Sequence, residues 1–228
     1  MFYYDWTYIL VLIGLGLTLL AQAGVSSAFN RYSKVRSVTG LTGAAAAQKV
    51  LAAFGIFDVR IEQVSGKLTD HYDPRSKTLR LSTSTYASPS VAAICVAAHE
   101  CGHAEQDARR YGPLVLRSTL VPAANIGSQL AWPIFFAGLI FSLRFLTMAG
   151  IALFSLAVLF QLVTLPVEFD ASARALRVLK ESAILPDDEL AGGKKVLQAA
   201  ALTYVAALAS SILQLVRLIL LSQRRSRR

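Results

Sequence analysis

The sequence predicts a mainly α-helical integral membrane protein with about four membrane helices and a small β-hairpin or sheet. Hydrophobic residues make up 54% of the 228 residues, and the mean hydropathy is +0.50. Charged residues make up only 16%, whereas about 25% is typical of soluble domains. The apolar residues are also concentrated in long stretches, which indicates membrane helices separated by a short soluble part.

Four stretches are long and apolar enough to cross a bilayer, which takes about 17–25 residues in a helix. They predict membrane helices over residues 6–30, 118–143, 145–167 and 196–221. The first is expected to be retained and not cleaved as a signal peptide, because the residues before it carry no Lys or Arg. The last contains several polar side chains, so it either spans the membrane or lies partly in the interface.

Residues 31–117 form the soluble part, and we expect the whole chain, residues 1–228, to fold as one membrane-embedded domain. Apolar and polar residues alternate over 56–64 as in a half-buried strand, and Asp-Pro begins a turn at residue 73. Ser88 and Pro89 suit the cap and first position of a helix. The expected order is a helix (41–54), a strand (56–64), a turn (73–76), a returning strand (78–82) and a helix (88–110), with a helix and loop at 168–195 after the membrane hairpin.

The net charge of +9 does not predict a nucleic-acid-binding protein, because the basic residues lie beside the apolar stretches and in the tail at 224–228. More of them flank the soluble part than the other membrane ends, which predicts a multi-pass cell-membrane protein whose soluble part faces the cytoplasm. If the last helix spans, the arginine-rich tail lies outside, against the general rule that basic residues near membrane helices stay in the cytoplasm. The two cysteines, Cys95 and Cys101, point about 120° apart on one helix, so no disulfide is expected.

One segment, "VAAHECGHAEQ", contains the pattern H-E-x-x-H at residues 99–103. On a helix, His99 and His103 share a face and can hold one metal ion. Glu100 lies beside them, where it can take a proton from a zinc-bound water as that water attacks a carbonyl. The pattern arises by chance in a shuffled chain on the order of once in a thousand, although two structural core histidines remain the alternative.

A catalytic zinc site needs a third protein ligand, and several nearby residues do not qualify. Arg109 occupies the position where metzincins have a third histidine. Cys95 is eight residues from His103, about 12 Å along a helix, so the two cannot bind one ion. Asp107 is excluded in the same way by its distance from His99.

Glu168 is the remaining candidate for the third ligand. It follows the second helix of the expected membrane hairpin, which returns the chain to the side of the membrane where His99 and His103 lie. The alternative is that Glu168 is simply the first charged residue after a membrane helix.

Four segments together resemble the YugP-type membrane zinc metallopeptidases: "LTDHYDPRSKTLRLS", "VAAHECGHAEQ", "LPVEFDASARAL" and "AALTYVAA". The resemblance covers nearly the whole chain. It implies a zincin-like helical core in which His99, His103 and Glu168 bind one Zn²⁺ and Glu100 is the general base.

The layout is also similar to the HtpX and CAAX prenyl protease group, in which E-x-x-x-D supplies an Asp that orients a ligand histidine. Here Ser172 occupies that position, and Asp170 is the nearby acidic residue. Asp170 is therefore a possible supporting residue. His71 and Tyr204 are possible stabilisers of the oxyanion, although for His71 a place in a hairpin turn is the favoured interpretation.

These observations predict a membrane-bound zinc-dependent endopeptidase that acts on peptide or protein substrates associated with the membrane. The lipid bilayer is its expected environment, and no nucleic-acid partner is expected. The alternative is a non-catalytic membrane adaptor or assembly factor whose metal site only stabilises the fold.

Overall fold

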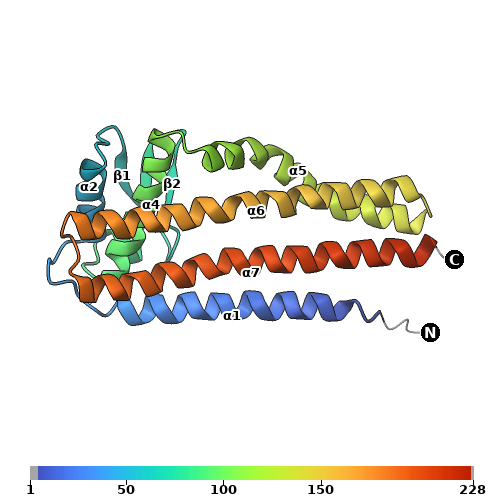
Figure 1. Ribbon diagram of the computed structural model, residues 1–228, viewed down its shortest axis with the longest axis horizontal. Coiled ribbons are helices and arrows are strands. Elements are labelled where there is room, and N and C mark those ends of the chain that lie inside the picture. Colours follow the sequence, from blue (N-terminus) through green and yellow to red (C-terminus); the bar gives the residue numbers. More distant parts are fainter. Residues whose placement is uncertain (1–4, 227–228) are drawn as a thin grey trace. The chain divides into compact units, whose positions relative to one another are not determined.

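The computed structural model describes residues 5–226, and the side chains of the predicted tail from residue 224 onward lie outside its description. It confirms the predicted class, because long helices dominate and the strands form one small sheet (Figure 1). The elements in chain order are α1 (Tyr8–Tyr32), α2 (Gly43–Ala53), β1 (Arg60–Val64), β2 (His71–Asp73), β3 (Thr78–Ser82), α3 (Thr83–Tyr86), α4 (Val91–Ala108), α5 (Gly112–Ile140), α6 (Arg144–Glu181) and α7 (Asp187–Ser226).

Four helices in the described part are long and apolar enough to cross a membrane, namely α1, α5, α6 and α7. This confirms the expectation of about four membrane helices. Helices α6 and α7 are longer than predicted, at 38 and 40 residues. Each continues from an apolar part into a more polar part without a break, so hydropathy alone did not mark where they end.

The chain divides into two compact units, and helices α1, α5, α6 and α7 contribute to both. The helical unit contains Met1–Gln22, Leu116–Leu165 and Leu202–Arg228. The mixed unit contains Ala23–Val115 and Pro166–Ala201, and it therefore includes the H-E-x-x-H segment and Glu168. The prediction that these parts act as one domain stays a prediction.

Close contacts between backbones hold the helices of the helical unit together. A Cβ atom on Gly127 of α5 would lie 2.8 Å from the carbonyl oxygen of Leu153 on α6. On another pair of helices, the hydroxyl of Ser210 on α7 donates to the carbonyl of Gly14 on α1 at 2.8 Å. Small residues at such contacts are typical of membrane helices, which gain little from burying apolar side chains against each other in place of lipid.

The sheet of the mixed unit has the strand order β1-β3-β2. The turn predicted at residues 73–76 is present, since the carboxylate of Asp73 accepts hydrogen bonds from the Arg75 amide at 3.0 Å and the Ser76 hydroxyl at 2.7 Å. It joins β2 to β3 as an antiparallel pair. The expectation that residues 78–82 return along the strand at 56–64 is wrong, because β1 pairs with β3 in parallel and residues 65–70 carry the chain back first.

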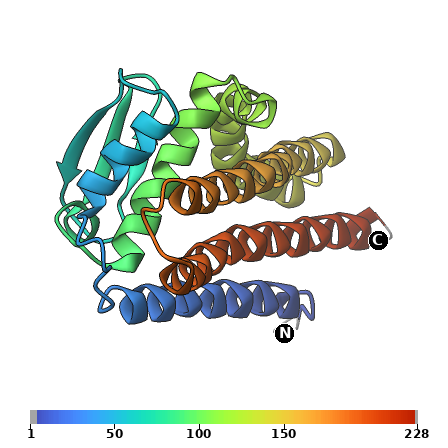
Figure 2. The same ribbon diagram turned by 60° about the vertical axis from the view of Figure 1, so that its left-hand side comes forward.

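Helices α2 and α4 pack side by side next to this sheet (Figure 2). Their shared core is rich in alanine, which allows the two helices to approach closely, and it includes Ala47, Ala97 and the fully buried Leu81 of β3. Cys95 and Cys101 are buried in the same core as free thiols. Helix α4, which carries the H-E-x-x-H segment, is thus supported over most of its circumference.

Helix α4 begins later than predicted, because Ser90 and not Ser88 is its cap. The Ser90 hydroxyl accepts a hydrogen bond from the amide of Ala93 at 3.2 Å. Residues before it are held in extended conformation, since the Pro89 carbonyl accepts from Ser37 and Ser90 forms a β-bridge with Arg36. This pairing with the segment after α1 excludes Pro89 from the helix.

Candidate metal and active site

The two histidines of H-E-x-x-H lie one turn apart on α4, and their rings meet edge to face with centroids 4.8 Å apart. Both direct Nε2 toward the same carboxylate oxygen of Glu168 on α6. The distances to Glu168 Oε2 are 3.3 Å for His99 and 3.6 Å for His103. One nitrogen from each ring and a carboxylate oxygen therefore lie within 4.8 Å of one another, and such a group could hold one metal ion.

Hydrogen bonds at the far side of each imidazole orient the two rings. His99 Nδ1 lies 3.1 Å from the hydroxyl of Ser172, and His103 Nδ1 lies 3.0 Å from Oε1 of Gln106. Because an amide oxygen can only accept, Nδ1 of His103 donates in this contact, and in the neutral imidazole Nε2 is therefore the nitrogen with a lone pair for a metal ion. Two imidazole nitrogens and one carboxylate form a donor set that suits zinc with one open position.

Glu168 is buried, with 2% of its surface exposed, and it is placed by the close approach of α6 to α4. Burial alone would lower the pKa of His103, whereas its hydrogen bond to Glu168 and the nearby Glu100 carboxylate raise it, and the net pKa is above its usual value. Two carboxylates close to two imidazoles thus create a negative potential that favours a cation.

Glu100 lies on α4 between the two histidines but turns toward the sheet. Its Oε2 accepts a hydrogen bond from the backbone amide of Tyr72 on β2 at 3.1 Å. The Tyr72 hydroxyl donates to Oδ2 of Asp107, two turns further along α4, at 2.9 Å. Burial and this carboxylate together raise the pKa of Tyr72. Tyr72 therefore attaches β2 to α4 at both Glu100 and Asp107, and Asp107 has a partner away from the histidines.

The comparisons with known proteins decide the family. A family model described as "Putative neutral zinc metallopeptidase" matches residues 7–223. The chain belongs to this zinc metallopeptidase family. It is 46% identical over 212 residues to "Putative membrane protease YugP" of Bacillus subtilis, an alignment that covers 93% of this chain and 94% of that protein. No solved structure matches.

Membership in the zinc metallopeptidase family confirms the resemblance found from the sequence and the expectation of a zinc cofactor. The family and the apolar helices also agree with a membrane protease that acts on peptides. The His-His-Glu group supplies the residues that could hold the family's metal.

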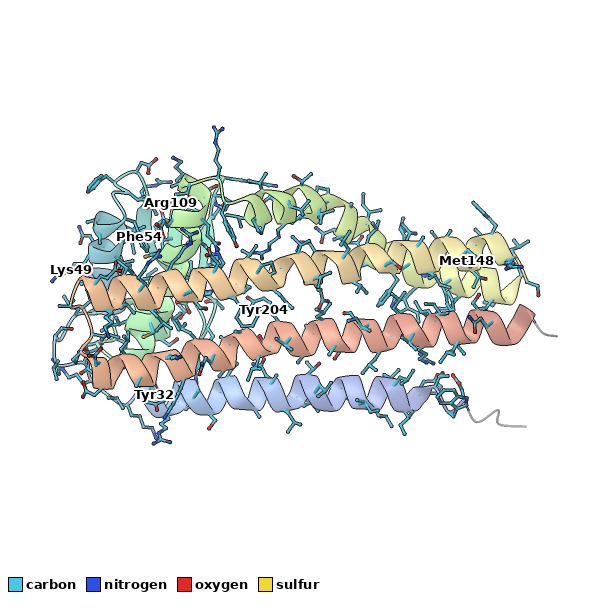
Figure 3. All side chains as sticks on the ribbon, in the orientation of Figure 1. Tyr32, Lys49, Phe54, Arg109, Met148 and Tyr204 are labelled. Atoms are coloured by element: carbon cyan, nitrogen blue, oxygen red, sulfur yellow. The ribbon has the colours of Figure 1, made fainter. Side chains whose placement is uncertain are left out.

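The remaining residues suggested by the sequence lie elsewhere in the two units. His71 is on β2 and is exposed, with Nδ1 2.9 Å from the carbonyl oxygen of Thr69. Its neighbour Tyr72 faces α4, so the alternation of a strand directs His71 to the opposite face. Tyr204 lies on α7 in the helical unit, not in the mixed unit (Figure 3). Their roles as stabilisers of the oxyanion stay predictions.

Asp170 follows Glu168 by two residues on α6, about half a helical turn, and contacts other residues. Its Oδ2 accepts hydrogen bonds from Nε2 of Gln106 at 2.8 Å and from Nε of Arg174 at 2.5 Å. Ser172, at the position where an E-x-x-x-D pattern would have its aspartate, contacts His99 directly. The segment is helical throughout, and residues two and four positions after Glu168 therefore point in different directions.

Sequence reasoning missed Gln106, which is buried next to His103, and Glu105, which is buried next to Arg174. Nη1 of Arg174 lies 3.3 Å from Oε2 of Glu105, and the guanidinium group lies 5.4 Å from the centroid of the Tyr111 ring. A glutamine or glutamate on an alanine-rich helix carries no sequence signal of burial. For Gln106 the available signal was its spacing from the two histidines, because positions 99, 103 and 106 share one face of a helix.

Proposed function

We propose that this protein is a membrane-bound zinc endopeptidase in which His99, His103 and Glu168 hold the metal and Glu100 is the general base. The observation that carries the proposal is the convergence of three ligand atoms beside a fourth, non-ligating acidic residue. A metal site that only stabilised the fold needs no acidic residue beside its ligands, although Glu100 also joins β2 to α4 through the Tyr72 amide. The adaptor alternative has no comparable observation in its favour.

Each residue has a distinct task in this proposal. Zinc, when bound, would polarise the scissile carbonyl and lower the pKa of a water molecule. Glu100 takes the proton from the attacking water and later delivers it to the leaving amine. The amide of Tyr72 holds Oε2 of Glu100, so Oε1 is the oxygen available for this transfer. Ser172 and Gln106 keep the imidazoles turned toward the metal.

The substrate class that fits is a peptide or protein at the membrane, and the charge distribution favours a cytoplasmic site. Because α1 and α7 are each long enough to span, both ends of the chain would then lie outside. Reporter fusions test this directly. A phosphatase fused after residue 226 should be active and a fluorescent protein inactive, and the reverse result would contradict either the cytoplasmic placement or the spanning of α7.

Replacing Glu100 with Gln tests the mechanism. Glu100→Gln should bind zinc like the parent but lower kcat on a peptide substrate at least about 100-fold, because general base catalysis contributes roughly 10²–10⁴-fold. Zinc content by mass spectrometry and peptide cleavage in detergent provide the two measurements. Glu181→Gln is the matched control, since Glu181 is exposed at the end of α6. Full activity in zinc-loaded Glu100→Gln would refute the proposal, and a zinc-loaded parent without turnover would favour the adaptor.

A further inference from the structure

We propose that Gln106 is a positioning residue of the metal site, which sets the tautomer of His103 and ties it to the turn of α6 that carries Glu168. The inference rests on the proposed function, since it assigns a role around the same metal. Gln106 is completely buried, three residues after His103 on α4.

All the polar atoms of the Gln106 side chain are used. Oε1 accepts from His103 Nδ1 at 3.0 Å, and Nε2 donates to the Val167 carbonyl and to Oδ2 of Asp170, both at 2.8 Å. One acceptor at one end and two donors at the other is the hydrogen-bonding pattern of a primary amide. A carboxylate of the same length would keep the bond to His103 but would meet two acceptors on α6.

The two acceptors on α6 lie on either side of the third ligand in sequence. Val167 immediately precedes Glu168, and Asp170 follows it by two residues. A single amide therefore fixes the position of His103 relative to the turn that carries Glu168. Because zinc ligands must lie within about 2 Å of one ion, a small shift between the two helices would weaken binding.

Asp170, the residue on α6 to which the Gln106 amide donates, is itself held in place by Arg174. Arg174 donates to the same Oδ2 of Asp170 at 2.5 Å and also pairs with Glu105 on α4. The carboxylate of Asp170 is thus held between an arginine and Gln106, and it acts on His103 through the amide. His99 differs, because Ser172 of α6 contacts it directly. The two ligand histidines are therefore both oriented from α6, one directly and one through Gln106.

The test uses zinc affinity in the full-length protein, measured by competition with a chromophoric chelator. Gln106→Glu should weaken zinc binding about 10–100-fold, which is typical of losing a residue that orients a metal ligand. Adding Asp170→Asn gives the new carboxylate an N–H donor on α6 and should recover most of the affinity. Gln106→Met, which adds no charge, should lose the affinity without recovery by Asp170→Asn.

Two controls separate the possible outcomes. Gln48→Glu places the same change at an exposed position of α2 and should leave zinc affinity unchanged. The melting temperature of the zinc-free protein distinguishes positioning from folding, because a purely structural role would lower it in every Gln106 variant and would show no selective recovery. If the parent binds zinc and Glu100→Gln is inactive, yet the Gln106 variants hold zinc like the parent, this inference is wrong while the proposed function stands. If the parent binds no zinc, the proposed function itself fails.

Discussion

A Cβ atom on Gly102 would lie 2.5 Å from the carbonyl oxygen of Ala171, so α4 and α6 touch backbone to backbone beside the metal-ligand group. Gly102 lies between Glu100 and His103, and Ala171 follows Glu168 by three residues. The glycine in H-E-C-G-H thus allows the two helices to approach closely enough for the nitrogen and oxygen atoms of His99, His103 and Glu168 to converge.

Gly102→Ala should therefore separate the helices and weaken the site. In an ordinary helix, Gly to Ala stabilises by up to about 1 kcal/mol. Here the backbone carbonyl cannot move aside, so we expect a loss of about 1–3 kcal/mol and reduced zinc retention. Thermal unfolding and zinc content measure both effects. Gly24→Ala on α1 is the control, because nothing lies within 4 Å of its Cβ position. Equal behaviour of the two variants would contradict the close-contact argument.

Removal of single ligands should remove the metal. His103→Ala and Glu168→Ala are each expected to lose the single zinc ion that the parent holds, because three protein ligands are the minimum for a catalytic zinc site. Mass spectrometry of detergent-purified protein gives the metal content, and circular dichroism shows whether each variant is folded. Glu181→Ala serves as the control. Zinc retained by Glu168→Ala but lost by His103→Ala would place the third ligand elsewhere.

The ion pair between Arg174 and Glu105 should stabilise the junction of α4 and α6. Glu105 is 2% exposed, so Arg174→Met would leave a buried carboxylate whose remaining ion-pair partner within the described part of the chain is Arg109, at a cost of up to about 3 kcal/mol. Adding Glu105→Gln should recover much of this stability. Arg177→Met, on the exposed side of the same helix, should change the free energy of unfolding by less than about 0.5 kcal/mol. Chemical unfolding in detergent compares the four proteins, and no recovery in the double variant would count against the pairing.

The two cysteines should resist alkylation in the folded protein. Burial raises the pKa of Cys95 to about 12 and raises that of Cys101 well above its usual value. The reactive thiolate is therefore almost absent at pH 8 and increases only as the pH rises toward these values. N-ethylmaleimide at pH 8 should label neither thiol before denaturation and both afterwards, as read by mass spectrometry. Ser182→Cys, at an exposed position, should be labelled at once. Rapid labelling of Cys95 in the native protein would argue against the core described here.

Some of these features follow from the sequence because they depend on short spacing or on composition. Apolar stretches of about 20 residues predict membrane helices, since no other backbone arrangement within one segment satisfies its hydrogen bonds in lipid. The spacing of His99 and His103 predicts a shared helix face. Glu168 follows from topology, because a helical hairpin must return the chain to the side from which it left.

The sequence was less informative about strand pairing and helix ends that depend on contacts between segments far apart in the chain. The parallel pairing of β1 with β3 depends on the path of residues 65–70, which periodicity does not indicate. The cap of α4 shifted from Ser88 to Ser90 because an extended segment after α1 pairs with the residues before the helix.

The sequence by itself determined the class of protein, through its composition, and the pairing of His99 with His103 and the proposal of Glu100 as general base, through local spacing along one helix. Only the tertiary structure decided how the ligands are oriented. Gln106 and Ser172 are ordinary helix residues until α6 packs against α4. Their roles depend on contacts over more than 60 residues of chain, and such contacts arise from the packing of whole helices.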